Sequence, residues 1–250
     1  MHLQTVIDQL RSMRLTTMAE SLQNRLSTND AEGLEPAEFV ALLVDDEYSA
    51  RKRRKMERMI SRANFKPDQA TIENILYEGQ RGFIKKDIMR FTNSEWVENR
   101  RNIIITGPTG CGKSYLAEAI GYKACTMGYP TQKLRYAILF EEIHSAKGTG
   151  QYLKYLSKLS KVKVLVIDDF LMCSIDCRDA ETLMDIIEEK DQTGSVIITT
   201  QFPVQKWHAR LPDPTIADAI CDRLVHSAIQ FNLKGESLRK KNKIITQNDR

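Results

Sequence analysis

The sequence predicts an α/β fold, in which a five-stranded parallel sheet is flanked by helices and preceded by a small all-helical N-terminal domain. From Asn102 onward, short apolar runs rich in β-branched residues alternate with helical patterns, which is typical of parallel sheets. One of these runs leads into a glycine-rich loop, and another ends in two adjacent aspartates. The expected strands are 103–106, 131–134, 164–167, 196–199 and 229–233.

Apolar periodicity predicts the helical N-terminal domain. Between Leu3 and Leu26, apolar residues recur at roughly three- and four-residue spacing, which indicates an amphipathic helix with one buried face. A turn-rich stretch then ends this helix, and a second helical pattern begins at Pro36. The chain is expected to divide into a helical domain at 1–66, a connector at 67–101 and an α/β domain at 102–250.

Charge is distributed unevenly along the chain, although the formal net charge is only +4. Residues 1–50 carry three basic and nine acidic side chains, whereas residues 51–66 carry eight basic side chains and one acid. Cations this dense repel one another without an anionic partner, so we expect this run to contact DNA or another subunit. The DNA-binding candidates within it are Arg51, Lys52, Arg53, Arg54 and Lys55.

Composition narrows the cellular setting. No apolar run approaches the ~18 residues that span a bilayer, and the N-terminus lacks a basic region followed by an apolar one. The five cysteines are odd in number and scattered, which argues against a disulfide framework. We therefore expect a cytoplasmic protein with reduced thiols and no membrane partner.

The segment GPTGCGKS, from Gly107 to Ser114, matches the GxxxxGK[ST] pattern in full between an expected strand and an expected helix. Glycines allow the backbone to curl so that N–H groups point at phosphate oxygens. Lys113 should neutralise the β- and γ-phosphates, and Ser114 should offer its hydroxyl to Mg²⁺. The expected ATP-binding residues are Gly107, Pro108, Thr109, Gly110, Cys111, Gly112, Lys113, Ser114 and Tyr115.

Two carboxylates follow the apolar strand 164–167, where a P-loop protein needs its second metal-anchoring element. We expect Asp168 to hold the Mg²⁺ shell together with Ser114. Asp169, one residue further on, is the candidate general base that orients and activates the attacking water. The sequence thus predicts an ATPase that uses ATP and Mg²⁺.

The residue types alone leave the roles of several other polar residues open. Thr199, Thr200 and Gln201 end one strand, where they either reach toward the γ-phosphate or form an ordinary turn. Arg223 and Arg239 either stabilise γ-phosphate charge or pair with acidic neighbours on the surface.

The motifs GPTGCGKS, VLVIDDF, ITTQFP, DAICDRLVH and GESLRK occur in an order and spacing that resemble the AAA+ helicase-loader and initiator group. Within that group the chain resembles the IstB/DnaC-like ATP-binding family, which includes the transposition helper ATPases of bacterial insertion sequences. The resemblance covers essentially the whole chain. It implies an AAA+ fold and a homo-oligomer.

The resemblance also implies roles for the ambiguous residues. Arg223 corresponds to an arginine finger that enters the ATP site of the adjacent subunit, so that turnover depends on assembly. Arg239 corresponds to the second sensor, and the first sensor falls at Thr200 or Gln201. The sequence departs from the common AAA+ pattern in lacking an asparagine at this sensor and in having Asp169 where many members have glutamate.

Members of the group carry an extra helix before the strand that ends in the metal-anchoring aspartate, and it grips nucleic acid. Here that region is 135–163, which Gly148 and Gly150 should split into two helical pieces. Lysines that neutralise phosphates do not read bases, so binding should be largely sequence-independent and salt-sensitive. A solvated helix face is the alternative. The DNA-binding candidates of this region are Arg135, Tyr136, Lys147 and Lys154.

The function that the resemblance implies is that of a transposition helper. It would oligomerise on duplex DNA, remodel or bend the target, recruit and stimulate a partner transposase (IstA-like), and disassemble on ATP hydrolysis. A DnaC-type loader, which places a replicative helicase on single-stranded DNA, is the alternative. A small-molecule P-loop kinase would need a lid and an acceptor pocket, neither of which the sequence locates.

Overall fold

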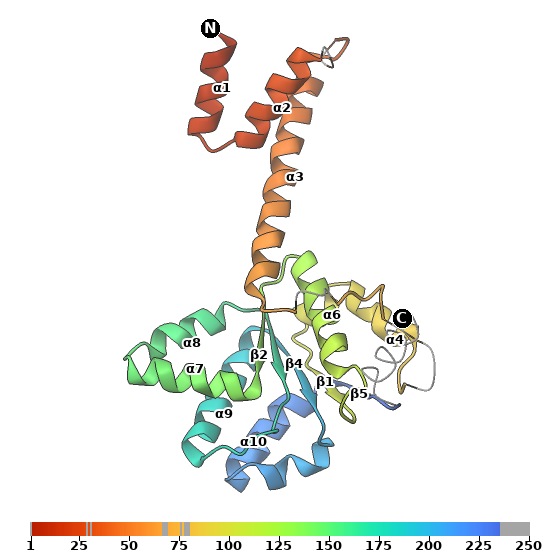
Figure 1. Cartoon of the computed structure of the whole chain (residues 1–250), viewed down its shortest axis with the longest axis vertical. Coiled ribbons are helices and arrows are strands. Elements are labelled where there is room, and N and C mark those ends of the chain that lie inside the picture. The colour runs from red at the N-terminus through yellow and green to blue at the C-terminus, as the bar shows by residue number, and fades with distance from the viewer. Residues whose placement is uncertain are drawn as a thin grey trace, which may run out of the picture. The chain divides into compact units, whose positions relative to one another are not determined.

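The computed structural model describes residues 2–28, 30, 32–66, 70–75, 77 and 81–235 (Figure 1). The chain forms two compact units, Met1–Arg58 and Met59–Arg250. The division falls inside the helix α3 (Pro36–Arg62).

The first unit consists of α1 (Leu3–Ser12), α2 (Thr16–Ser27) and the greater part of α3. The single helix expected between Leu3 and Leu26 is therefore two helices, because Arg14 adopts a left-handed backbone with φ 61° between them. Met13 and Met18, which flank this break, interrupt the three- and four-residue apolar spacing. The core of the unit is formed by Ile7, Leu10, Ala19, Leu22 and Leu43.

The second unit is built on a five-stranded parallel sheet with the strand order β2-β3-β4-β1-β5. The prediction of such a sheet is confirmed, and each strand lies within one residue of its expected bounds at either end. The strands are β1 (Ile103–Thr106), β2 (Thr131–Arg135), β3 (Val164–Asp168), β4 (Ser195–Thr200) and β5 (Ile229–Asn232).

Helices cover both faces of the sheet, with α6 on one side and α9 and α10 on the other (Figure 1). Because both faces of the sheet are covered, an inner strand such as β3 is buried on both sides and is a continuous apolar run. Within β3, Val166 packs on the α6 side, whereas its neighbours Leu165 and Ile167 pack on the opposite side. The principal helices are α6 (Lys113–Thr126), α7 (Tyr136–Gly148), α8 (Tyr152–Ser160), α9 (Cys177–Thr193) and α10 (Pro214–Val225).

The region expected to be a connector, 67–101, contributes to the core of the second unit. Its described residues include Ile88, Phe91 and Trp96, which are buried in the apolar cluster on the α6 side. The Phe91 ring packs edge-on against Trp96 and Phe231, with ring centroids 5.7 and 5.9 Å apart. The remaining short elements are α4 (Lys85–Met89), η1 (Arg90–Thr92), α5 (Glu95–Glu98), η2 (Val204–Lys206) and η3 (His208–Arg210).

The α7–α8 pair forms the two helical pieces expected on either side of Gly148 and Gly150. It is held to α9 by Lys190, a lysine that is only 1% exposed. The Lys190 ammonium donates hydrogen bonds to the carbonyls of Leu159 and Val162, at 2.6 and 2.7 Å, where α8 ends. Burial lowers the pKa of Lys190 to about 8. This side chain thus bonds to carbonyl groups at the end of α8, where helical partners run out; the Leu159 carbonyl also accepts the Val162 N–H at 3.1 Å.

Replacing Lys190 with methionine should lower the free energy of unfolding by about 3 kcal/mol, because buried carbonyls would lose their donor. Urea unfolding followed by tryptophan fluorescence measures this directly, since both tryptophans, Trp96 and Trp207, belong to the second unit. The control is Lys158→Met on the exposed side of α8, which should change stability by no more than about 0.5 kcal/mol. Equal effects in the two variants would contradict the anchoring role.

None of the helices in the described part of the chain is both long enough and apolar enough to cross a membrane.

Candidate nucleotide-binding site

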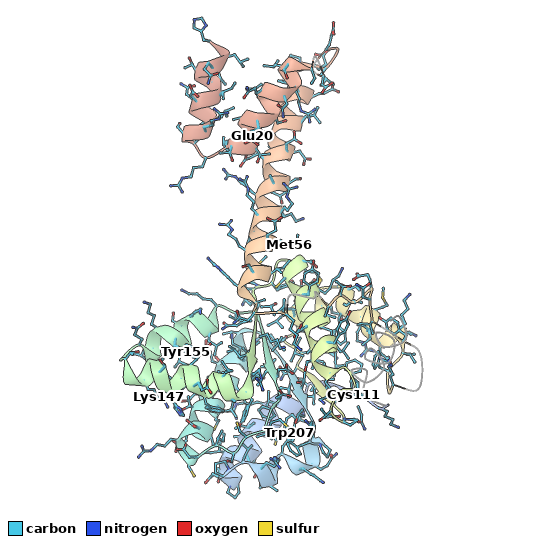
Figure 2. All side chains as sticks on the ribbon, viewed as in Figure 1. Glu20, Met56, Cys111, Lys147, Tyr155 and Trp207 are labelled. Carbon is cyan, nitrogen blue, oxygen red and sulfur yellow. The ribbon has the colours of Figure 1, made fainter. Side chains whose placement is uncertain are left out.

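The glycine-rich loop joins β1 to the first turn of α6. Gly107, Gly110 and Gly112 have positive φ values of 148°, 84° and 98°. At Gly107 an added Cβ would lie 2.5 Å from the carbonyl oxygen of Leu233, so no larger residue fits there without moving the backbone. A loop of this shape at a helix N-terminus presents backbone N–H groups to an anion. Figure 2 labels Cys111 within this loop.

A cavity of about 800 Å³ opens at the loop. Residues 109–116, together with Asp169 and Gln201, form part of its wall. The volume is within the range of sites that take a small molecule or cofactor. The loop predicted from the motif and two of the residues predicted from strand ends therefore meet at one cavity.

Several cavity residues were missed by sequence reasoning. They come from the region treated as a connector and from the end of β5, and they are Asn74, Ile75, Arg81, Phe83 and Leu233. No motif marks them, since they reach the cavity only through packing against the sheet. One hydrogen bond, from the Lys234 N–H to the Arg81 carbonyl at 3.0 Å, joins these two parts of the chain.

Asp168 lies at the end of β3 beside the first turn of α6. The Ser114 hydroxyl donates to Asp168 Oδ1 at 2.8 Å, and the Thr199 hydroxyl also donates to this oxygen. Burial opposes ionisation of Asp168, but the hydrogen bond from Thr199 and the charge of Lys133 outweigh it and lower the pKa. A serine hydroxyl and an ionised carboxylate are hard oxygen ligands of the kind that Mg²⁺ prefers, so the pair fits this ion.

Asp169 is on the cavity wall, and its side chain is 41% exposed. Its backbone is left-handed, with φ 59°, a conformation that aspartate tolerates better than most residues. The Asp169 N–H donates to the Thr199 hydroxyl at 3.1 Å, and Arg135 Nε lies 3.7 Å from Asp169 Oδ2. Thr199, which the residues alone left ambiguous, thus bonds to both aspartates.

The two candidates for the first sensor have different surroundings. Thr200 is fully buried, and its hydroxyl donates to the Phe170 carbonyl at 2.8 Å and accepts from the Phe202 N–H at 3.2 Å. Gln201 is on the cavity wall. Of these two described residues, Gln201 lines the cavity and Thr200 does not.

Of the two candidate arginines, only Arg223 lies within the part of the chain that the structure describes. Arg223, in α10, is not among the described residues that line the cavity. The guanidinium lies 3.5 Å from Glu188 Oε1, and the Arg223 side chain is 28% exposed. Arg239 lies outside the described residues.

A buried ion cluster beneath the site was also missed. Lys133 in β2 lies between Glu118 of α6 and Asp168, with its Nζ 2.5 Å from Glu118 Oε1 and 2.9 Å from Asp168 Oδ2. A signal was present in the sequence, because a lysine in the middle of an expected buried strand needs an acidic partner. Periodicity cannot say which acid that partner is.

Among the DNA-binding candidates near α7, the prediction for Tyr136 is wrong. Tyr136 is fully buried, and its ring packs edge-on against Phe140 and Phe170 at 5.1 Å from each, so it forms part of the core. Arg135 is at the wall of the cavity, beside Asp169.

The two lysine candidates lie on the α7–α8 pair, where Figure 2 labels Lys147 and Tyr155. Lys147 donates to the Thr182 hydroxyl at 2.8 Å and lies 5.2 Å from the centre of the Tyr152 ring. Lys154 is exposed.

The basic run in α3 divides into two groups. Arg51 and Arg54 bind the buried carboxylate of Glu47 at 2.7 and 3.4 Å, and Glu47 also accepts the Met18 N–H at the start of α2. These arginines therefore help to hold the helical unit together. The other candidates, Lys52, Arg53 and Lys55, are exposed.

Comparisons with known proteins agree with this geometry. Residues 8–246 match the family described as IstB-like ATP binding protein. The chain is 36% identical, over 94% of its length and 95% of the relative's, to a protein of Sinorhizobium fredii named as an insertion sequence ATP-binding protein (y4pL).

Solved structures show the same fold at low sequence identity. The replication initiator DnaA bound to AMPPCP and single-stranded DNA matches with a TM-score of 0.58 and 18% identity, over 74% of this chain and 57% of that one. The DnaC helicase loader matches with a TM-score of 0.55 and 19% identity, over 66% of this chain and 97% of that one. The chain belongs to the IstB-like ATP-binding protein family and is an AAA+ ATPase.

Proposed function

We propose that this protein is an ATP-dependent transposition helper. It oligomerises on duplex DNA, remodels or bends the target, and recruits and stimulates the partner transposase, after which ATP hydrolysis drives disassembly. The observation that carries the proposal is a cavity lined by the P-loop and Asp169, with Asp168 hydrogen-bonded to Ser114 of that loop, whereas Arg223 is not among the described residues that line it. The relative named for an insertion sequence supports the transposition setting.

Within the cavity, the residues divide the work of hydrolysis. The P-loop N–H groups and Lys113 hold the phosphates, and Ser114 and Asp168 hold Mg²⁺, which neutralises charge on the β- and γ-phosphate oxygens when bound. Asp169 orients and deprotonates the attacking water, and Gln201 contacts the γ-phosphate as the first sensor. The presence of both Asp169 and Gln201 among the residues that line the cavity supports this division.

The arginine that completes the site comes from a neighbouring subunit in this proposal. Arg223 is in α10, partly exposed and outside its own cavity, which favours a role in trans. Such an arrangement makes ATP turnover depend on assembly, because an isolated subunit lacks the cation that stabilises the transition state. Arg239 is proposed as the second sensor of its own subunit.

DNA contact is assigned to exposed cations in two places. Lys52, Arg53 and Lys55 of α3 and Lys154 of α8 present side chains to solvent. They are proposed to bind phosphates without reading base edges. Internal contacts already occupy part of the side chains of Arg51, Arg54 and Lys147. In this proposal these three residues contact DNA only with the part that remains exposed.

Duplex DNA should stimulate ATP turnover, and duplex affinity should fall about 100-fold between 50 and 200 mM salt if four or so phosphates are neutralised. Exchange of Lys52, Arg53 and Lys55 together for alanine should weaken binding and reduce the salt dependence. The matched control is a triple alanine variant of the exposed cations Lys85, Lys86 and Arg90 in the second unit. Binding is measured by fluorescence anisotropy and turnover by phosphate release.

The same experiment separates the alternatives when single-stranded DNA is added as a third arm. A DnaC-type loader would bind single strands more tightly than duplex and be stimulated by them. Turnover indifferent to both forms of DNA would reject the assembly on DNA and restore the small-molecule kinase as a candidate.

A further inference from the structure

Lys133 occupies an unusual place for a charged residue. It lies in β2 opposite Val166 of β3, and Asp168 is two residues further along β3, so both side chains are on the same face of the sheet. That face is otherwise packed with apolar residues such as Val164 and Leu116. The Lys133 side chain is 8% exposed.

Two carboxylates hold this ammonium. Glu118 is one helical turn after Ser114 in α6, so it lies on the same side of the helix, and Lys133 Nζ is 2.5 Å from its Oε1. Asp168 Oδ2 is 2.9 Å from the same nitrogen. The three side chains are each no more than 8% exposed and together carry one net negative charge.

The cluster is also fixed from outside. The Lys133 N–H donates to the Ala63 carbonyl at 2.7 Å, and the Lys66 N–H donates to Glu118 Oε2 at 3.4 Å. Backbone groups therefore hold Lys133 and Glu118 in place, in addition to the ion pair between them. The ammonium that contacts Asp168 is fixed in position as a result.

Folding alone does not require charges at these positions. Exchanging a buried ion pair for apolar side chains of similar volume is often neutral or stabilising, whereas removal of one partner leaves a costly buried charge. Asp168, however, must remain a carboxylate if it is to anchor a cation. The ion pair is best explained by what it does to Asp168.

We propose that Lys133 is a positioning residue for the metal-anchoring carboxylate. Its ammonium holds Oδ2 of Asp168 on the side away from Ser114, which leaves Oδ1 for the Ser114 hydroxyl. Glu118 takes part of the ammonium's charge, so that the cluster retains a net negative charge that attracts Mg²⁺. The inference rests on the proposed role of Asp168 as the magnesium-anchoring residue.

The test measures the affinity of the protein for a fluorescent, non-hydrolysable ATP analogue, once with Mg²⁺ and once in excess EDTA. The ratio of the two affinities is the tightening factor. The double variant Lys133→Met with Glu118→Met removes the ammonium and the second carboxylate together, so the net charge of the cluster stays at minus one, and Asp168 keeps its hydrogen bonds from Ser114 and Thr199. We expect the tightening factor to fall about tenfold, as is typical when a residue that supports a metal ligand is lost. Affinity in EDTA should be unchanged.

Three further variants make the result unambiguous. Glu118→Gln should also reduce the factor, because the whole ammonium charge then falls on Asp168. Lys190→Met removes another buried lysine of the same unit and should cost stability without changing the factor. Asp168→Asn should abolish the tightening.

The outcomes separate the inference from the proposed function. If the double variant retains the native factor while Asp168→Asn loses it, Lys133 does not position Asp168 and the inference is overturned. If Asp168→Asn itself retains the native factor, the proposed role of Asp168 fails first. Neither measurement depends on DNA or on turnover.

Discussion

Replacing Arg223 with alanine should lower duplex-stimulated ATP turnover by about 1,000-fold, the lower end of what an arginine finger supplies. ATP binding should persist, because Arg223 is not among the described residues that line its own subunit's cavity. Stability should change by less than about 1 kcal/mol, since the partly exposed pair with Glu188 is the kind of surface contact that contributes little.

The matched control is Arg178→Ala, which removes an exposed arginine from the neighbouring helix α9 and should leave turnover unchanged. Turnover and analogue binding are measured on both variants at the same protein concentration. An Arg223 variant with native turnover would reject the finger, and one that no longer binds ATP would place Arg223 in its own site.

Asp169→Asn should lower kcat by about 100- to 10,000-fold, the range for loss of a general base, with little change in ATP affinity. Asparagine tolerates the left-handed backbone of this position nearly as well as aspartate does, so the loop should keep its shape. The amide cannot accept a proton from the attacking water. Single-turnover hydrolysis separates this chemical step from binding.

The control for Asp169 is Asp191→Asn, which neutralises an exposed aspartate at the end of α9. It should leave kcat and ATP affinity unchanged. If Asp169→Asn hydrolyses ATP at the native rate, the base lies elsewhere, and the other acid at this end of β3, Asp168, becomes the candidate.

The sheet and the phosphate loop could be predicted because their signals are local. Each strand is a contiguous run of apolar, largely β-branched residues, and GPTGCGKS contains the glycines that its backbone requires. The same locality explains two errors. The break at Arg14 depends on the backbone conformation of one residue, which apolar periodicity does not reveal. The prediction that Tyr136 contacts DNA requires an exposed side chain, whereas Tyr136 begins α7 with its ring in the core.

The rest of the site is assembled from contacts between distant parts of the chain. Phe83 and Leu233 line the same cavity although they are far apart in the sequence, and no pattern in either segment predicts this contact. Lys133 was visible as a charge within an expected strand, but its partners Glu118 and Asp168 lie on a different helix and strand. Such pairings depend on the order of the strands in the sheet and on which side of each helix packs against it. Neither can be read from the sequence of one segment.

The central claim is that each ATP site is completed by a neighbouring subunit, and mixing two inactive variants tests it most directly. The Arg223→Ala subunit keeps its own Asp169, and the Asp169→Asn subunit keeps its Arg223. In an equal mixture on duplex DNA, about a quarter of head-to-tail interfaces would pair an intact ATP site with an intact arginine. We predict turnover near that fraction of the native rate, whereas a mixture no more active than its separate components would contradict the claim.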